Sequence, residues 1–246
     1  MIELLSFDVG VKNLAYCKVR FENDDHKIIE WGIIDTMENF NDRITKCSVS
    51  RNGKICDATA VSYVDVDDKI IGFCNKKNCQ SILTSVYSKK QIKKTKKVNT
   101  KTVSLFDISK SMMSKLLEKP SLLSVDKVII ENQPVLKNPT MKSIQMVLYS
   151  FFVLEGALKD NKLNDIVMFN AGGKLDIYQG PIIELPDNIK KGTYKDRKYR
   201  SIEYTKYFLR NDKDNLDFFN KHKKKDDLAD SYLQCLTYYK KNYKNA

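Results

Sequence analysis

Three aspartates crowd together near the end of a strongly basic chain, in the stretch KKKDDLADSYLQC at residues 223–235. Apolar residues at helical spacing follow them, which predicts a helix beginning near Asp226 and Asp227. Capping and the helix dipole favour carboxylates there, which accounts for those two. Asp230 lies one turn further in, where a like charge three residues from Asp227 costs about 0.2–0.5 kcal/mol. A divalent cation between Asp227 and Asp230 would turn that repulsion into coordination.

Two further acids interrupt apolar stretches upstream. Asp8 ends IELLSFD, and Gly10 follows it, which allows a tight turn and the close approach of a phosphate to the backbone. Glu131 ends KVIIE in the same manner. A buried charge without a partner is costly, so a salt bridge to a nearby lysine is the alternative for either acid alone. Strand ends and helix N-termini meet at one edge of an α/β sheet, so the four acids are expected in one site.

Four carboxylates in a basic protein predict phosphodiester hydrolysis by two metal ions. Two Mg²⁺ or Mn²⁺ ions roughly 3.5–4 Å apart would activate a water and stabilise the leaving 3′ oxygen. Such hard cations prefer oxygen ligands, and neither of the two histidines stands in a recognised ligand pattern. No small-molecule cofactor is expected.

The charge balance points to a polyanionic partner. Lys and Arg number 43 against 31 Asp and Glu, a formal net charge of +12, and nucleic acid is the simplest partner for such a chain. The basic residues gather at 89–101, 191–200 and 221–225, and the last two clusters carry Tyr or His that could stack on bases. The alternative for each cluster is a solvated face.

The elements that must hold these residues form an α/β pattern. β-branched and aromatic residues predict three strands at 2–8, 11–21 and 27–36, arranged as an antiparallel meander. Beyond residue 102, helices are expected at 103–119, 140–160, 197–211 and after residue 225, with strands at 125–134 and 165–170. The order predicts one domain over residues 1–246, built on a mixed five-stranded sheet with helices on both faces. Residues 37–102 are expected to be a lysine-rich insertion after the third strand.

Three stretches together resemble a known family: SFDVGVKNLAY, VIIENQP and KKDDLADSY, in this order. They are similar to the RuvC-like Holliday junction resolvases of the RNase H-like superfamily, and most similar to the branch encoded by poxviruses and other large DNA viruses. The resemblance covers residues 1–36 and about 103–242. It implies Asp8, Glu131, Asp227 and Asp230 as the metal ligands and leaves Asp226 as a cap or an outer residue. It also implies a catalytic lysine ahead of the last helix, for which Lys198 matches best and Lys191 second.

By this resemblance the protein would be a homodimer that cuts four-way DNA junctions by paired, symmetric nicks. Two active sites on a two-fold axis suit a two-fold substrate. The apolar helix from Thr140 to Lys159 would supply much of the dimer surface, although it could also be core. With no membrane span or signal segment apparent, we expect a soluble intracellular protein, in the viral replication compartment of an infected cell's cytoplasm.

Four cysteines lie in the insertion, within CSVSRNGKIC and FCNKKNC: Cys47, Cys56, Cys74 and Cys79. Four thiolates in two pairs predict a structural zinc site, although eight and four intervening residues depart from the usual spacing of two. Zinc would staple a segment too polar to build a core and present the lysine run to DNA. A loop with reduced, unliganded cysteines is the alternative, and disulfides are disfavoured in a reducing compartment. Cys17 and Cys235 are expected to be buried small hydrophobes.

Three other functions stay open on the sequence. A nuclease acting on RNA or another DNA structure would keep the same acids. An ATP-handling protein of the actin and sugar-kinase type also carries a phosphate loop like FDVG, and AGG at 171–173 would fit it, but such proteins usually need two such domains. A non-catalytic, zinc-containing DNA-binding protein is disfavoured because carboxylates near DNA weaken binding unless metals neutralise them.

Overall fold

The computed structural model describes residues 1–246 except 24, 41–45, 68, 96–98, 137, 160, 171 and 245–246. The chain divides into two compact units. The first, here called the sheet unit, comprises Met1–Thr36 and Leu105–Ala246, and the second, the cysteine unit, comprises Met37–Ser104. Among the described residues, no helix has both the length and the apolar character needed to cross a membrane.

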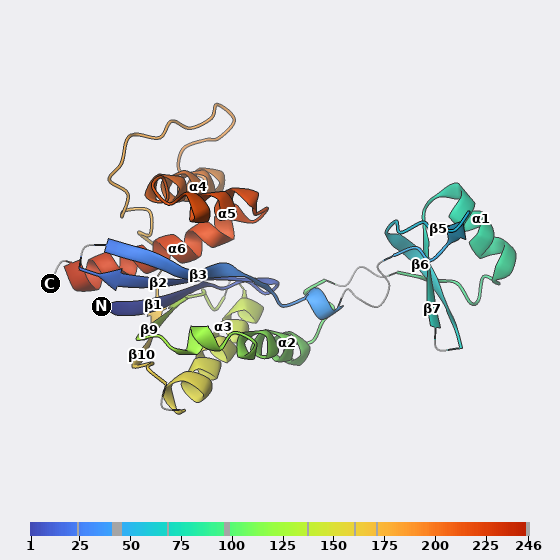
Figure 1. Ribbon diagram of the computed structural model, residues 1–246, viewed down its shortest axis with the longest axis horizontal. Coiled ribbons are helices and arrows are strands. Elements are labelled where there is room, and N and C mark those ends of the chain that lie inside the picture. Colours follow the sequence, from blue (N-terminus) through green and yellow to red (C-terminus); the bar gives the residue numbers. More distant parts are fainter. Residues whose placement is uncertain are drawn as a thin grey trace. The chain divides into compact units, whose positions relative to one another are not determined.

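A five-stranded mixed sheet forms the centre of the sheet unit (Figure 1). Its strands are β1 (Ile2–Asp8), β2 (Asn13–Glu22), β3 (Asp25–Asp35), β9 (Lys127–Glu131) and β10 (Asp165–Phe169), in the order β10-β9-β1-β2-β3. The first three pair antiparallel, whereas β9 runs parallel to both β1 and β10. The central strands are almost wholly buried, because helices cover both faces of the sheet. The predicted mixed sheet with helices on both faces is confirmed.

Helices cover the two faces unequally. On one side lie α4 (Tyr194–Phe208), α5 (Lys213–Lys221) and α6 (Lys225–Tyr239), and on the other α2 (Leu105–Leu117) and α3 (Pro139–Phe152), as Figure 1 shows. The short helical turns are η1 (Glu38–Phe40), η2 (Pro120–Leu123), η3 (Val153–Ala157) and η4 (Lys240–Lys244). The helix predicted at 197–211 corresponds to α4, and α5 is an additional helix that was not predicted. The hydroxyl of Thr193 caps α4 and the carboxylate of Asp212 caps α5, each accepting from a backbone N–H three residues on.

The core between sheet and α6 fixes where that helix begins. Trp31 stacks on Phe219 with ring centroids 5.4 Å apart, and its indole N–H donates to the carbonyl of Leu228 at 3.1 Å. The buried amide of Gln234 donates to the carbonyls of Phe7 on β1 and Ile129 on β9, both at 3.3 Å. As a result, the N-terminus of α6 lies beside the C-terminal ends of these two parallel strands.

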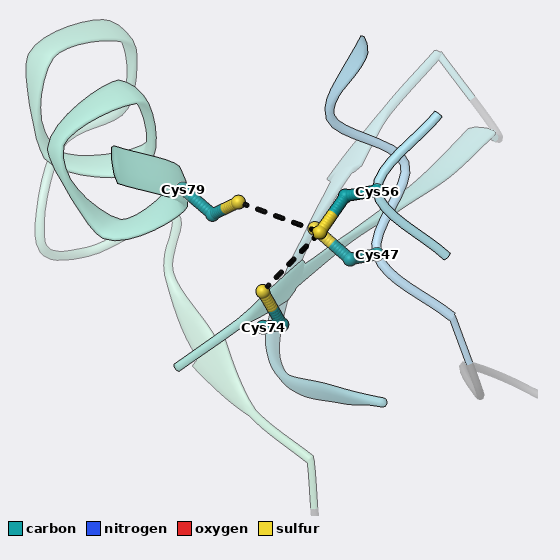
Figure 2. A group of neighbouring side chains, drawn as sticks. All are labelled: Cys47, Cys56, Cys74 and Cys79. Carbon is teal, nitrogen blue, oxygen red and sulfur yellow. Dashed lines mark hydrogen bonds between the residues drawn. The ribbon is translucent and has the colours of Figure 1, made fainter. Parts of the chain in front are cut away.

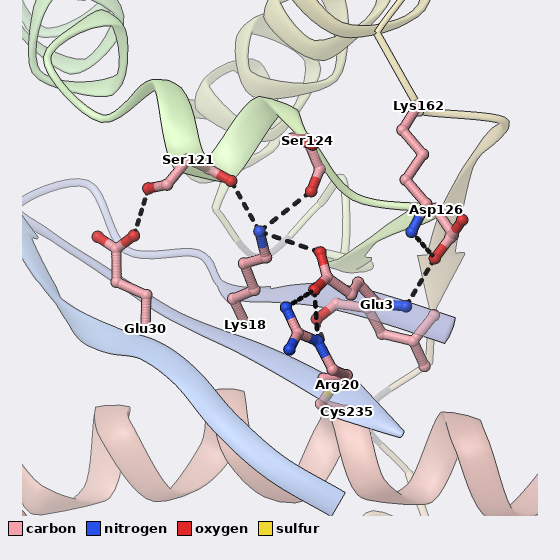
Figure 3. A network of polar contacts seen from close by, with 10 residues as sticks. Glu3, Lys18, Arg20, Glu30, Ser121, Ser124, Asp126, Lys162 and Cys235 are labelled. Atoms are coloured by element: carbon pink, nitrogen blue, oxygen red, sulfur yellow. Dashed lines mark hydrogen bonds and ion pairs between the residues drawn. The ribbon is translucent and has the colours of Figure 1, made fainter. Parts of the chain in front are cut away.

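A buried ion network ties the opposite face to the chain that follows α2 (Figure 3). The ammonium of Lys18 donates to the carbonyls of Ser121 and Ser124 at 2.9 and 3.0 Å and pairs with Glu3 at 3.2 Å. Arg20 pairs with the same carboxylate. Burial alone would raise the pKa of Glu3, but Arg20 and Lys18 bring it below its usual value, so this carboxylate is ionised and fully partnered.

The cysteine unit has its own sheets and core. Its strands are β4 (Ser50–Arg51), β5 (Lys54–Ile55), β6 (Ala60–Val66), β7 (Lys69–Cys74) and β8 (Lys93–Lys94), with helix α1 (Lys77–Val86) following β7. Strands β7, β6 and β8 form one sheet, and β4 with β5 a separate hairpin. Val64, Phe73 and Leu83 are buried with three of the cysteines. The expectation that this segment is too polar to build a core was therefore wrong, because part of its apolar residues pack around the cysteines, while others such as Ile55 and Val86 are exposed. Lys96 and Lys97 of the predicted lysine run lie outside the described residues.

Candidate active site

One cavity of about 750 Å³ opens at the C-terminal edge of β1 and β9, beside the start of α6. All five residues predicted to be catalytic line it: Asp8, Glu131, Asp227, Asp230 and Lys198. Strands β1 and β9 are parallel neighbours in register, so their last residues leave the sheet at the same edge. The second-choice lysine, Lys191, and the lysines at 223–225 are not part of the lining.

Gly10 makes the turn after β1 possible. A side chain at this position would bring its Cβ to 2.4 Å from the carbonyl oxygen of Asn13, so this close backbone approach requires glycine. The turn carries Lys12 and Asn13 into the cavity lining. The amide of Asn13 lies 3.4 Å from the carboxylate of Asp227 and donates to it.

Asp8 and Glu131 are held close enough to interact directly. Burial, a hydrogen bond with Glu131, and the negative charges of Glu131 and Asp230 raise the pKa of Asp8 well above its usual range. Burial and the charge of Asp226 likewise raise the pKa of Asp227. Two acids with raised pKa values in one cavity mark a site of strong negative potential.

Lys174 lies among these acids, and the sequence analysis did not identify it. Its ammonium is 2.6 Å from the Asp230 carboxylate, and its side chain is only 16 % exposed. Burial alone would lower the pKa of Lys174, but the charges of Asp230, Glu131 and Asp8 raise it. Gly173 precedes it with φ +88°, a backbone conformation that favours glycine. The Gly-Gly-Lys at 172–174, separated from the end of β10 by two residues, was the available signal, and the sequence analysis associated it with a nucleotide loop instead.

Lys198 has a different environment from the one expected. Its ammonium pairs with Asp226 and lies 4.8 Å from the ring centre of Tyr194. Burial opposes the charge, but Asp226 and Tyr194 raise the pKa of Lys198, so it stays protonated. Of the two roles expected for Asp226, the cap is wrong, because the N-cap residue of α6 is Lys224 and its side chain makes no capping hydrogen bond. The outer position stays a prediction, and Asp226 lies in the cavity lining, paired with Lys198.

The donor set fits divalent cations. Each predicted acid offers hard carboxylate oxygens, the ligands that divalent cations prefer. The ammonium of Lys174 already places one positive charge among these carboxylates, next to Asp230. Asp230 is oriented by the hydroxyl of Ser201, which donates to its second oxygen at 2.5 Å. Within the described part of the chain, the side chains grouped closely enough to hold a metal are the four cysteines, whose sulfurs lie within 4.8 Å of one another. The acids line a cavity instead, as a site shared with a substrate would require.

The rim of the cleft is basic and aromatic. Lys12, Arg197 and Lys198 lie in the lining, and Tyr194 beside them is 64 % exposed. Two of the cations come from the cluster at 191–200, so that cluster is part of the cleft. Acids at the floor and cations at the rim suit a phosphodiester backbone lying over metal ions.

The four cysteines of the insertion converge as predicted (Figure 2). The sulfur of Cys56 lies 3.7 Å from that of Cys74 and 3.9 Å from that of Cys79. A disulfide needs about 2.05 Å, whereas four thiolates about 2.3 Å from a tetrahedral Zn²⁺ lie about 3.8 Å apart. A backbone hydrogen bond from Ala58 and the neighbouring thiols lower the pKa of Cys56 to about 7, and burial raises the pKa of Cys79 to about 12. The geometry fits Zn²⁺. Cys17 and Cys235 are buried in the sheet unit, as expected.

The chain is similar to known proteins in both sequence and structure. Residues 4–158 match the model of the family described as mitochondrial resolvase Ydc2 / RNA splicing MRS1. The uncharacterized protein L451 of Acanthamoeba polyphaga mimivirus is 29% identical over 307 residues, covering 95% of this chain and 73% of that protein. Among solved structures, the fowlpox virus resolvase with Holliday junction DNA shows 17% identity and a TM-score of 0.46, covering 98% of this chain and 99% of that one. The yeast mitochondrial Holliday junction resolvase Ydc2 shows 14% identity and a TM-score of 0.48, covering 98% and 85%.

Proposed function

This chain belongs to the family described as mitochondrial resolvase Ydc2 / RNA splicing MRS1, and from that membership we propose that it resolves four-way DNA junctions with divalent metal ions. Membership confirms the resemblance to Holliday junction resolvases and the predicted enzyme class, a junction-cleaving nuclease. The matched region, residues 4–158, includes Asp8 and Glu131. The pair Asp227 and Asp230 lies beyond it, and its role rests on the cavity.

One observation carries the proposal: four carboxylates and a buried lysine line a single cleft with a basic rim. The family description also includes RNA splicing, so a protein that binds nucleic acid without cutting it is the competing function. Four carboxylates in a binding cleft would oppose a polyanion, and they favour the nuclease because metal ions can use them.

In the proposed reaction, Asp8, Glu131, Asp227 and Asp230 would hold two Mg²⁺ or Mn²⁺ ions. The ions would supply an activated water and stabilise the leaving 3′ oxygen. Asp8 would have to be ionised to serve as a ligand, because a metal binds the carboxylate form. Lys174 donates from its ammonium to a phosphate oxygen above Asp230, while Arg197 orients the backbone at the rim.

A homodimer with paired, symmetric nicks is part of the proposal. Helix α3 and the turn after it bury Ile144, Leu148 and Phe152 in the core. The same segment exposes Met146, Leu154 and Leu158 at 42, 55 and 69 %. The two readings of this helix, core and dimer surface, are therefore compatible, and the exposed side chains are the ones proposed to meet a second copy.

We further propose that Zn²⁺ binds Cys47, Cys56, Cys74 and Cys79 and is structural. Four protein ligands leave no open position for catalysis.

We also propose that the protein acts in a viral replication compartment. Its similarity to a protein of mimivirus supports this setting.

The test compares the cutting of a four-way junction, a linear duplex, a flap and an RNA–DNA hybrid in Mg²⁺. We expect symmetric nicks in the junction and little cutting of the others. Asp8→Asn and Glu131→Gln should each keep junction binding and abolish nicking, while Asp214→Asn, an exposed acid of α5, should behave as wild type. Efficient cutting of the hybrid with the junction left intact would refute the proposal.

A further inference from the structure

The hairpin of the cysteine unit places two cations face to face. Asn52 and Gly53 form its turn with φ of 48° and 74°, the left-handed pair that a two-residue hairpin needs. This turn sets Arg51 directly opposite Lys54 across β4 and β5. Like charges at directly opposed positions destabilise a strand pair, so this hairpin holds a repulsion that an anion would relieve.

A third cation joins them around a cavity of about 270 Å³, here called the basic cavity. Lys76, the N-cap residue of α1, contributes it. The full lining consists of Val49, Arg51, Lys54, Ile55, Cys56, Lys76, Asn78 and Cys79, without any carboxylate. Among the residues that the structure describes, the ion pair of this region is between Lys46 and Asp57, and Arg51, Lys54 and Lys76 enter none.

The charge of the whole unit has the same sign. Residues 37–104 contain twelve Lys and two Arg against five Asp and one Glu, a net charge of +8 out of +12 for the chain. A field of this sign draws in polyanions and holds them by releasing their counterions. Charge complementarity therefore favours nucleic acid as the partner of this surface.

We propose that the basic cavity binds a backbone phosphate of nucleic acid, as a contact separate from the catalytic cleft. The guanidinium of Arg51 offers paired N–H donors that match phosphate oxygens. Lys54 and Lys76 add two ammonium groups, and the first turn of α1 adds the positive end of its dipole. Cys56 and Cys79 form part of the wall, so zinc bound at the proposed site would hold the cavity in shape. Phosphate binding by the basic cavity does not depend on the proposed function. The further statement that the natural ligand is junction DNA does rest on it.

The experiment measures binding of the full-length chain to duplex DNA between about 50 and 200 mM salt. Magnesium is left out so that nothing is cut, and chelators are avoided so that zinc stays. The variant Arg51→Gln, Lys54→Gln, Lys76→Gln is compared with Lys27→Gln, Lys110→Gln, Lys213→Gln, which removes the same charge from exposed lysines of the sheet unit. Each phosphate contact contributes about 0.9 to the slope of log affinity against log salt.

We expect the cavity variant to lose about 2–3 from that slope and at least about tenfold in affinity, and the control to change less than about twofold. Zinc content equal to wild type shows that the unit is folded. Lys76→Gln alone, which leaves the hairpin intact, should lower the slope by about 0.9.

Equal loss in the two triple variants would overturn the inference, because it would mean that only total charge matters. The proposed function is read separately, as nicking of the junction by wild type in Mg²⁺. If wild type cuts nothing while the cavity variant still loses duplex binding, the resolvase proposal fails and the basic cavity stands.

Discussion

Lys174 and Asp230 form an ion pair of 2.6 Å on the floor of the cleft, and the other oxygen of Asp230 accepts from Ser201. Both oxygens of this carboxylate are therefore engaged. A cation that binds Asp230 must compete with the ammonium of Lys174, which then becomes available to a phosphate oxygen.

Lys174→Met should consequently bind Mg²⁺ more tightly without DNA but cut more slowly with it. We expect single-turnover nicking to fall by about 100-fold, the loss typical of removing one preorganised donor to a developing charge. Mg²⁺ affinity can be followed as the shift of the thermal midpoint with metal concentration. Lys198→Met is the matched control, because the ammonium of Lys198 pairs with Asp226 and not with Asp230. This variant should mainly weaken junction binding. A larger loss of cutting rate in Lys198→Met would contradict this assignment.

Removing one acid should stabilise the metal-free protein. Burial, together with the hydrogen bond and charge of Glu131 and the charge of Asp230, raises the pKa of Asp8. Asp8→Asn removes the buried charge, so its thermal midpoint without divalent ions should lie above that of wild type. Wild type should gain stability on adding Mg²⁺, and the variant should gain little. Identical Mg²⁺-dependent shifts for both proteins would exclude Asp8 from the ligand set.

Elemental analysis should find one zinc per chain, lost in Cys47→Ser and in Cys74→Ser. Structural zinc contributes about 10–16 kcal/mol of binding free energy in small zinc domains, so a metal-free cysteine unit should unfold separately from the sheet unit. Limited proteolysis can detect this as cutting confined to residues 37–104. Cys17→Ala and Cys235→Ala should keep full zinc, since both thiols lie in the sheet unit. Full zinc in Cys74→Ser would rule out the four-cysteine site.

The stability of the sheet unit should fall in mild acid through His26. This ring lies 2.7 Å from the hydroxyl of the buried Tyr232, and burial lowers the pKa of His26 below its ordinary 6.5. As pH drops below about 6.5, the unfolded chain therefore takes up a proton that the folded protein resists. Stability is fully present above that pH and is lost as pH falls through the folded pKa. Denaturant unfolding between pH 8 and 5 should show a smaller loss for His26→Gln than for wild type or His222→Gln.

The four acids could be predicted from sequence because each stands at the end of a strongly patterned element. Asp8 and Glu131 end apolar strands, and Asp227 and Asp230 begin a helix with clear apolar spacing. The position of a strand end in a mixed sheet follows from topology, so the convergence could be inferred before any coordinates were known.

Lys174 could not be found in this way because the loop after β10 has no periodicity. Its position depends on the left-handed backbone at Gly173 and on tertiary charge, neither of which follows from residue spacing. The partner of Asp226 could not be predicted from residue spacing either. Its place at the start of a helix indicated a cap, but its carboxylate pairs with Lys198, which is distant in sequence. Helix α5 was missed because nine residues give too short a pattern to separate from α4.

The amide of Gln234, held between the carbonyls of Phe7 and Ile129, also bears on how accurately the chain must fold. Asp8 and Glu131 are far apart in sequence, and a slip of one residue between β1 and β9 would turn one carboxylate to the opposite face of the sheet. The amide of Gln234 must reach both carbonyls at once, which disfavours such a slip. With the two strands misaligned, this buried amide would lack a hydrogen-bond acceptor. Gln234 therefore favours the alignment of β1 and β9 that places Asp8 and Glu131 on the same face of the sheet.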